Sequence, residues 1–221
     1  MKISKNTIEI LKNFSSINQN ILIKTGNVLT TRTVAKNLFA TATVDTDFPQ
    51  DFGIYNLQQF LGVLSLFSDP DVTLLDKMLT VSQGKNTVNY MYASPEVLDY
   101  PEKAIVMPAT DADFELSEEN LKSLLKAGAV LSSTDLKISG DGEKISCTVL
   151  DPKNVSANTF SVEVGATTRT FDIFIKLENL KLLIGKYNVA LSEKKIAHFS
   201  NAAVAYSLYI ANEKNSVWTP V

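Results

Sequence analysis

The side chains that could perform acid–base, nucleophilic or metal chemistry are few in this chain of 221 residues. There is one histidine, His198, and one cysteine, Cys147. A zinc helix needs His-Glu-x-x-His, and a nucleophilic serine is commonly marked by Gly-x-Ser-x-Gly, but the sequence contains neither motif. The glycine-rich loops that bind nucleotide phosphates are absent as well. We therefore predict a protein that is not an enzyme and holds no metal or cofactor, with His198 in a structural role.

Some aspartates have a spacing that metal sites also use. Each pair lies in a segment predicted to be a turn or a linker, where aspartate is favoured because its carboxylate accepts hydrogen bonds from nearby backbone N–H groups. We interpret them as turn formers rather than metal ligands. The pairs are Asp45/Asp47, Asp69/Asp71 and Asp111/Asp113.

The lysines are the remaining candidates for contact with a ligand. The formal net charge is −3, so no overall positive field attracts nucleic acid, and any contact must be local. Several lysines fall on the polar faces of segments with helical periodicity, and charges act within a screening length of about 8 Å. Neighbouring glutamates dilute this charge, so the pattern supports at most weak, sequence-independent phosphate contact. For any one lysine, a solvated position on a helix surface is the simpler interpretation.

A repeated stretch defines the helices that carry these lysines. Glu119–Leu125 recurs as Glu178–Ile184, and related copies occupy Asn56–Gly62 and, more weakly, Thr7–Leu11. Apolar residues at i, i+3 and i+4 form one stripe on a helix. The sequence predicts four short helices with one buried face each, unless the Leu-x-x-Leu-Leu similarity is a chance feature of helical sequence. The expected ranges are 3–18, 56–67, 119–127 and 178–184, with Gly128 ending the third helix.

Between the helices, apolar and polar residues alternate, as in half-buried strands. Each half is expected to follow the order βαβββ, which predicts an α+β fold made of two similar domains with antiparallel sheets. Gly26-Asn27 is expected to form a tight turn between the first two strands, and residues 214–221 to lack regular structure. The expected strands are 20–25, 28–34, 38–44, 52–54, 72–75, 78–81, 88–92, 114–116, 134–139, 144–150, 160–164, 171–175, 187–191, 195–201 and 204–211.

A proline-containing segment separates the two halves. Pro95, Pro101 and Pro108 are spread through acidic and small residues without periodicity, which is typical of an extended linker. We predict an N-terminal domain at 1–93, a connector at 94–112 and a C-terminal domain at 113–221. No run approaches the roughly 18 apolar residues of a membrane span. A single cysteine, alternating with apolar neighbours, fits a buried strand position in a reducing compartment, so we expect a soluble cytoplasmic protein.

This pattern resembles the sliding clamps, and within them the two-domain, trimer-forming DNA polymerase processivity factors of T-even-type bacteriophages. The resemblance spans nearly the whole chain and has no short catalytic signature. It is carried by Leu11-Lys12-Asn13-Phe14, Thr30-Thr31-Arg32, Ile54-Tyr55-Asn56-Leu57, Phe60-Leu61-Gly62, Leu64-Ser65-Leu66 and the helix at Leu121–Leu125.

The resemblance implies three subunits that close head to tail into a ring around duplex DNA, with sheets outside and helices lining the hole. It also implies that an ATP-driven clamp loader places the ring, and that the polymerase and late-transcription factors dock through short peptides in an apolar cleft beside the connector. A viral clamp would act in the host cell cytoplasm. Topological linkage holds such a ring on DNA, so weak phosphate contact suffices.

The resemblance further implies which residues contact DNA and partners. Family members often have arginine in the third helix, whereas this helix has lysines and two glutamates, so we expect weaker DNA contact there. The connector residues assigned to partners could equally serve only to fix the linker. The predicted DNA-facing residues are Lys5, Lys12, Lys122, Lys126 and Lys181, with Lys2, Arg32 and Lys186 nearer the rims. The predicted partner-binding residues are Tyr100, Val106, Met107 and Pro108.

One alternative remains open at the level of sequence. A structural virion or appendage protein built from duplicated β-rich domains would also be acidic and free of catalytic motifs. It would give no reason for lysines to gather on the polar faces of helices.

Overall fold

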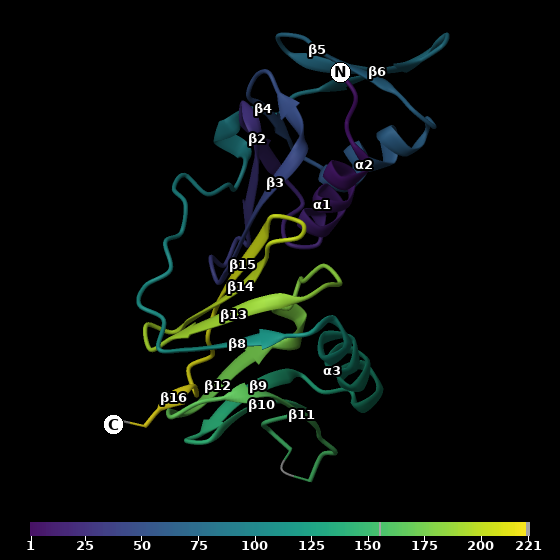
Figure 1. Ribbon diagram of the computed structural model, residues 1–221. Coiled ribbons are helices and arrows are strands. Elements are labelled where there is room, and N and C mark those ends of the chain that lie inside the picture. The colour runs from purple at the N-terminus through teal and green to yellow at the C-terminus, as the bar shows by residue number, and fades with distance from the viewer. Residues whose placement is uncertain (155, 220–221) are drawn as a thin grey trace. The chain divides into compact units, whose positions relative to one another are not determined.

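The computed structural model describes residues 1–154 and 156–219, and it divides the chain into two compact units (Figure 1). The N-terminal unit comprises Met1–Ala104 with Val204–Tyr206, and the C-terminal unit comprises Ile105–Ala203 with the residues from Ser207 on. The division falls inside the segment predicted to be a connector.

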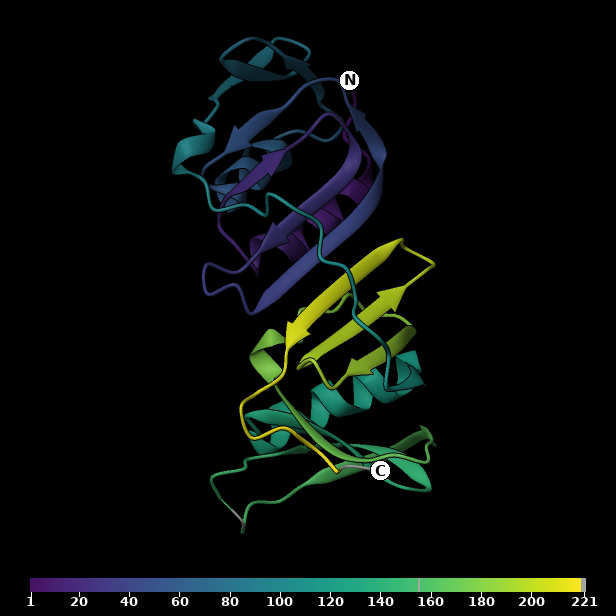
Figure 2. The same ribbon diagram turned by 90° about the vertical axis from the view of Figure 1, so that its left-hand side faces the viewer.

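The N-terminal unit combines two helices with small antiparallel sheets (Figure 2). β2 pairs with β3, β1 pairs with β4, and β5, β6 and β7 form a three-stranded sheet in that order. Its elements are α1 (Lys5–Ser15), β1 (Ile21–Ile23), β2 (Gly26–Arg32), β3 (Leu38–Phe48), β4 (Phe52–Ile54), α2 (Leu57–Ser65), β5 (Asp71–Leu74), β6 (Met78–Gln83), β7 (Asn86–Met91) and the 3-10 turn η1 (Pro95–Val97).

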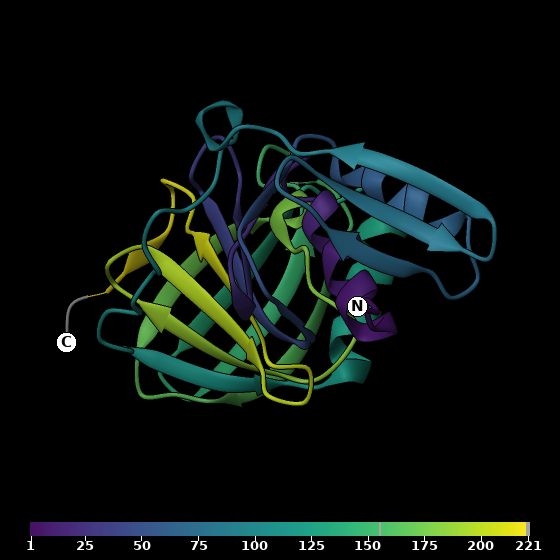
Figure 3. The same cartoon turned by 90° about the horizontal axis from the view of Figure 1, so that it is seen from above.

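The two helices of this unit pack against each other, and α2 lies along the β5–β7 sheet (Figure 3). The rings of Phe60 on α2 and Tyr90 on β7 meet edge to face with centroids 5.4 Å apart. On α1, Ile10, Leu11 and Phe14 are completely buried. One face of each helix therefore belongs to the core, which leaves the opposite face for solvent or a ligand.

The C-terminal unit contains one α-helix and two larger antiparallel sheets. One sheet has the order β11-β10-β9-β12-β16, and the other contains β15, β14, β13 and β8 as successive neighbours. Its elements are β8 (Ala112–Leu116), α3 (Glu118–Leu131), β9 (Asp135–Asp141), β10 (Lys144–Leu150), β11 (Phe160–Ala166), β12 (Thr170–Lys176), the 3-10 turn η2 (Leu177–Asn179), β13 (Tyr187–Ser192), β14 (Ile196–Asn201), β15 (Tyr206–Ala211) and β16 (Val217–Trp218).

Side-chain caps fix where the helices begin. The Ser4 hydroxyl accepts a hydrogen bond from the Thr7 N–H at 3.0 Å, and Ser117 accepts one from the Asn120 N–H at 3.1 Å. Asn56 caps α2 in the same way. Each cap satisfies a backbone donor that the first helical turn leaves without an intrahelical partner. The predicted helices at 3–18, 56–67 and 119–127 are therefore present, with bounds shifted by a few residues.

The predicted fourth helix at 178–184 is wrong. Only the three-residue turn η2 forms, and the chain then continues without α-helix. Leu180 and Leu182 are 8% and 9% exposed, whereas Ile184 is 54% exposed. This two-residue alternation suits an extended chain, while a helix would have buried residues 180, 183 and 184. Close packing also requires a glycine at position 185, because a Cβ there would lie 2.6 Å from Asn201 Nδ2.

Two predicted chain reversals of the N-terminal unit are also wrong. Gly26-Asn27 does not join a hairpin, because β1 pairs with β4 and β2 pairs with β3. Asp45 and Asp47 do not form a turn, since β3 continues to Phe48 and both aspartates are exposed on that strand.

Two predicted ends in the C-terminal unit differ as well. α3 does not stop at Gly128 but continues to Leu131, where Ser132 adopts the left-handed conformation with φ 53°. The tail is not irregular throughout, because Val217 and Trp218 pair with β12, and the Trp218 ring lies 4.6 Å from that of Phe171. Pro220 and Val221, which the tail prediction included, lie outside the described residues.

Candidate nucleic-acid interface

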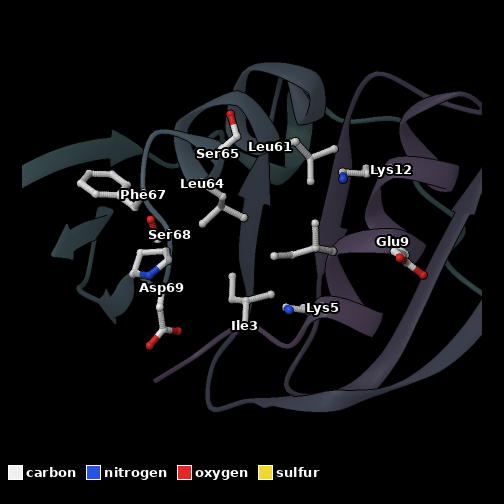
Figure 4. Close-up of a pocket in the computed structure, with 12 residues that line it drawn as sticks. Ile3, Lys5, Glu9, Lys12, Leu61, Leu64, Ser65, Phe67, Ser68 and Asp69 are labelled. Carbon is white, nitrogen blue, oxygen red and sulfur yellow. The ribbon is translucent and has the colours of Figure 1, made fainter.

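Lys5 and Lys12 lie on the exposed side of α1, at the margin of a hollow between α1 and α2. Figure 4 shows their ammonium ends on the side of Ile3 and Leu61, whereas the Glu9 carboxylate points away from the hollow. Within the described part of the chain, neither lysine's ammonium group forms a hydrogen bond or an ion pair. Both charges are therefore available to an anion.

The floor of this hollow is apolar. The hollow has a volume of about 360 Å³, and Ser65 and Ser68 line the side opposite α1. We call it the α1–α2 groove. Its apolar lining consists of Ile3, Ile8, Leu61, Leu64, Phe67 and Pro70. The sequence does not predict this groove, because Leu61 holds the i+4 position of a stripe expected to be buried, whereas in the structure it is only half-buried and lines the hollow.

On α3, Lys122 and Lys126 are both exposed, but their surroundings differ. Lys122 forms an ion pair with Glu118, one turn earlier on the same helix. Lys126 has no ion-pair partner among the described residues. An exposed i,i+4 pair is worth only about 0.3–0.5 kcal/mol, so Lys122 can rotate away, but Glu118 cancels its charge locally. Lys126 is therefore the better candidate for a phosphate contact on this helix.

The fourth lysine position differs from the prediction. Lys181 is half-buried in the irregular segment after η2, so it does not sit on the polar face of a helix. The structure does not give this side chain the setting that made it a candidate.

The second-choice cations already have carboxylate partners. Lys2 Nζ lies 2.9 Å from an Asp69 oxygen, and this hydrogen bond raises the pKa of the lysine above its usual value. Lys186 pairs with Glu115. Arg32 Nη2 lies 2.6 Å from Asp99, with both side chains about three-quarters buried. Arg32 is therefore a structural residue of the N-terminal unit.

The Arg32–Asp99 pair belongs to a larger set of contacts that fixes residues 98–99. Asn18 donates a side-chain hydrogen bond to the Asp99 carbonyl at 2.9 Å, and Asn20 accepts one from the Asp99 N–H at 3.0 Å. The neighbouring Leu98 is buried. The first part of the predicted connector is therefore packed against the N-terminal unit.

The predicted partner-binding residues fall into both units. Tyr100 is half-buried at the end of the N-terminal unit. In the C-terminal unit Val106 is 84% exposed, while Met107 and Pro108 are half-buried. An exposed valine in a connector has no packing role in its own unit, which keeps this residue as a candidate contact.

Among the described residues, no group of three or more histidine, cysteine, aspartate or glutamate side chains could hold a metal ion. The His198 ring stacks on Tyr209 with centroids 4.1 Å apart, and burial lowers its pKa. Burial raises the pKa of the Cys147 thiol to about 12, which makes it unreactive at neutral pH. None of the described helices is long and apolar enough to cross a membrane.

Comparison with solved structures identifies the fold as that of the DNA clamps. The PCNA of A. fulgidus, in a structure with the C-terminal region of FEN-1 bound, superposes with a TM-score of 0.71 at 10% identity, covering 95% of this chain and 96% of that one. The Helicobacter pylori beta clamp bound to a DNA ligase peptide gives 0.71 at 15% identity, covering 97% of this chain and 65% of that one. The predicted α+β clamp fold is confirmed.

Sequence comparison then places the chain in a particular family. The sliding clamp of Vibrio phage KVP40 is 30% identical over 96% of this chain and 99% of its own length, and that of Enterobacteria phage T4 is 32% identical over 88% of each. A family model described as DNA polymerase processivity factor matches residues 3–107. This chain belongs to the phage sliding clamps, which are non-enzymatic processivity factors for DNA polymerase. The alternative of a structural virion protein is thereby set aside.

Proposed function

We propose that this clamp acts as a closed ring of three copies, which encircles duplex DNA and tethers the replicative DNA polymerase to it. The observation that carries the proposal is the set of exposed, unpaired lysines on helices of both units, Lys5 and Lys12 on α1 and Lys126 on α3. Helices with a free cationic face suit a non-specific contact with phosphate.

Weak contact is what a sliding ring needs. A protein that neutralises many phosphates binds tightly and moves slowly, whereas a few exposed lysines in an acidic chain bind loosely. The net charge of −3 fits this requirement. In the proposed ring, closure around DNA prevents escape, and the lysines only keep the duplex centred.

Head-to-tail closure requires two different, complementary surfaces on each copy. Two unpaired sheet edges suit this role. β7 is the last strand of the three-stranded sheet in the N-terminal unit, and β11 is the first strand of the five-stranded sheet in the C-terminal unit. The β5 side is occupied, because Val72 exchanges backbone hydrogen bonds with Met1. We propose that β7 of one copy pairs with β11 of the next.

The partners follow from the same proposal. An ATP-dependent clamp loader opens the ring and places it on DNA, and the polymerase and late-transcription factors dock on it in the host cell cytoplasm. Tyr100, Val106, Met107 and Pro108 are the proposed contacts for their apolar peptides, with Val106 the most exposed of the four. Peptide recognition of this kind uses a few apolar anchors on a surface that needs no catalytic groups.

Two measurements test the proposal. Light scattering is expected to give a species near three times 24.3 kDa, and only monomers or open polymers would contradict closure. On primed circular DNA, the clamp with its loader and polymerase is expected to extend products manyfold beyond those of the polymerase alone. Equal product lengths with and without the clamp would remove the processivity role.

A further inference from the structure

The α1–α2 groove has more structure than contact with DNA requires. Phosphates are bound by cationic side chains at an exposed surface, and they make no use of an apolar floor. Yet Ile3, Leu61 and Phe67, which line the groove together with Lys5 and Lys12, are only half-buried. The groove therefore has unused apolar area beside two free charges.

The charge distribution around the groove is one-sided. Lys5 and Lys12 occupy the α1 margin, while Ser65, Ser68 and Asp69 line the opposite side, where the Asp69 carboxylate is paired with Lys2. The Glu9 carboxylate is directed away (Figure 4). A complementary ligand is therefore apolar on the face that enters the groove and anionic along the edge that meets α1.

The spacing of the lysines matches one ligand shape. Lys5 and Lys12 are seven residues apart on a regular helix, which separates their Cα atoms by about 10 Å along the axis. A second helix laid alongside has the same rise, so its carboxylates at i and i+7 meet both lysines in register. Its apolar residues at i+3 and i+6, to one side of the carboxylates, then fall over the floor of the groove.

We propose that the α1–α2 groove binds an amphipathic acidic helix of a partner protein. The partner helix buries leucine-type side chains against Leu61 and Leu64 and places its carboxylates on Lys5 and Lys12. The volume of about 360 Å³ lies within the range of pockets that take apolar anchors. Because phosphates use the same two lysines, a bound acidic helix excludes DNA from this part of the surface.

The test is a titration of the full chain with a defined probe. The probe is a fluorescein-labelled peptide of three heptads, with leucine at positions a and d, glutamate at position e, and alanine or glutamine elsewhere. A control peptide keeps the leucines and replaces each glutamate by lysine. Fluorescence anisotropy is expected to show saturable binding of the acidic peptide with a Kd in the micromolar range, and at least about tenfold weaker binding of the basic peptide.

Four variants separate the contributions of charge and apolar contact. Lys5→Gln with Lys12→Gln is expected to weaken the acidic peptide about tenfold, and Leu61→Asn by a similar factor. Lys85→Gln, at an exposed turn of the same unit, is the matched control and leaves the Kd unchanged. Glu9→Gln removes the nearby negative charge and tightens binding slightly. Circular dichroism and thermal unfolding confirm that each variant is folded.

Three results would overturn the proposal. They are the absence of saturable binding up to about 1 mM, equal binding of the basic peptide, and an unchanged Kd for Leu61→Asn. The last result, together with displacement of the probe by a short DNA duplex, would assign the groove to phosphate contact alone. The titration contains no loader, polymerase or primed template, so its outcome does not depend on whether the chain supports processive synthesis.

Discussion

At the scale of single residues, the structure separates the candidate DNA-contacting cations into those with a carboxylate partner and those without one. Lys5, Lys12 and Lys126 have no ion-pair partner among the described residues, whereas Lys122 lies against Glu118. Arg32 is committed to Asp99. The sequence shows that Glu118 precedes Lys122 by one helical turn, but it cannot show that Arg32 pairs with Asp99, which lies 67 residues away.

Reversing the charge of the free lysines should weaken DNA contact. Lys12→Glu with Lys126→Glu is expected to shorten loader-dependent synthesis severalfold, and to reduce the salt dependence of DNA binding by about 0.9 per lost contact. The run length on primed circular DNA and the slope of log K against log salt are the measurements.

The control for this experiment is Lys85→Glu, which has the same change of charge at an exposed turn. Its run length should equal that of the unmodified protein. If the double variant also matches the unmodified protein, these lysines do not face DNA.

The thiol of Cys147 should report on unfolding. It is completely buried on β10, and its pKa of about 12 keeps it protonated at pH 8. Ellman's reagent is expected to leave the native protein essentially unmodified and to label one thiol per chain in denaturing urea. Rapid stoichiometric labelling of the native protein would contradict the core position.

At the scale of elements, local signals succeed where the local sequence decides. Ser4 and Ser117 mark helix starts because the cap is made within four residues of each serine. The leucine spacing identifies α3 for the same reason. Leu180–Ile184 carries a similar spacing, yet here the chain is not helical, and Leu180 and Leu182 are the buried residues. The local spacing of apolar residues cannot show whether the rest of the unit favours a helix or a non-helical chain at this segment.

The same limit explains the strand errors and the missed groove. β1 pairs with β4 about thirty residues away, not with the adjacent β2. β16 is only two residues long and gains its order from β12. The α1–α2 groove joins residues from two helices separated by β1–β4, so its apolar floor is invisible to any single window of sequence.

The extended form of residues 180–184 can be tested by truncation. Leu182→Ala is expected to lower the free energy of unfolding by about 2–3 kcal/mol, because it opens a cavity beneath a buried side chain. Ile184→Ala should change it by less than about 0.5 kcal/mol, since this side chain is exposed. Urea unfolding measures both values. The reverse order of the two effects would favour the helical arrangement.

At the scale of the whole molecule, the proposed function depends on edges that a single copy leaves unpaired. β7 and β11 belong to different units of the chain. If β7 of one copy pairs with β11 of the next, each contact joins two different surfaces, which is a head-to-tail arrangement. Met91 at the end of β7 is 63% exposed, so this edge carries apolar surface that a pairing strand of another copy would cover.

Placing a charge at that edge should open the assembly. Met91→Asp is expected to shift the solution mass from about three times 24.3 kDa towards a single chain, because a carboxylate would be desolvated at the contact. The thermal unfolding of the separated chain should stay nearly unchanged, since Met91 is exposed within its own unit.

Val34→Asp is the matched control, because Val34 is also exposed, on the turn between β2 and β3. It should leave the mass unchanged. A Met91→Asp protein that keeps the full mass would move the contact away from β7.

The fastening of Asp99 by Arg32, Asn18 and Asn20 has a mechanical consequence. The part of the connector without such contacts therefore begins only after Asp99, so it is shorter than the proline-containing segment from residue 94 on. In the proposed partner contact, a protein bound to Tyr100 would be one residue away from the folded N-terminal unit. A force exerted by a moving polymerase at Tyr100 would therefore act directly on that unit, with little extension of the connector.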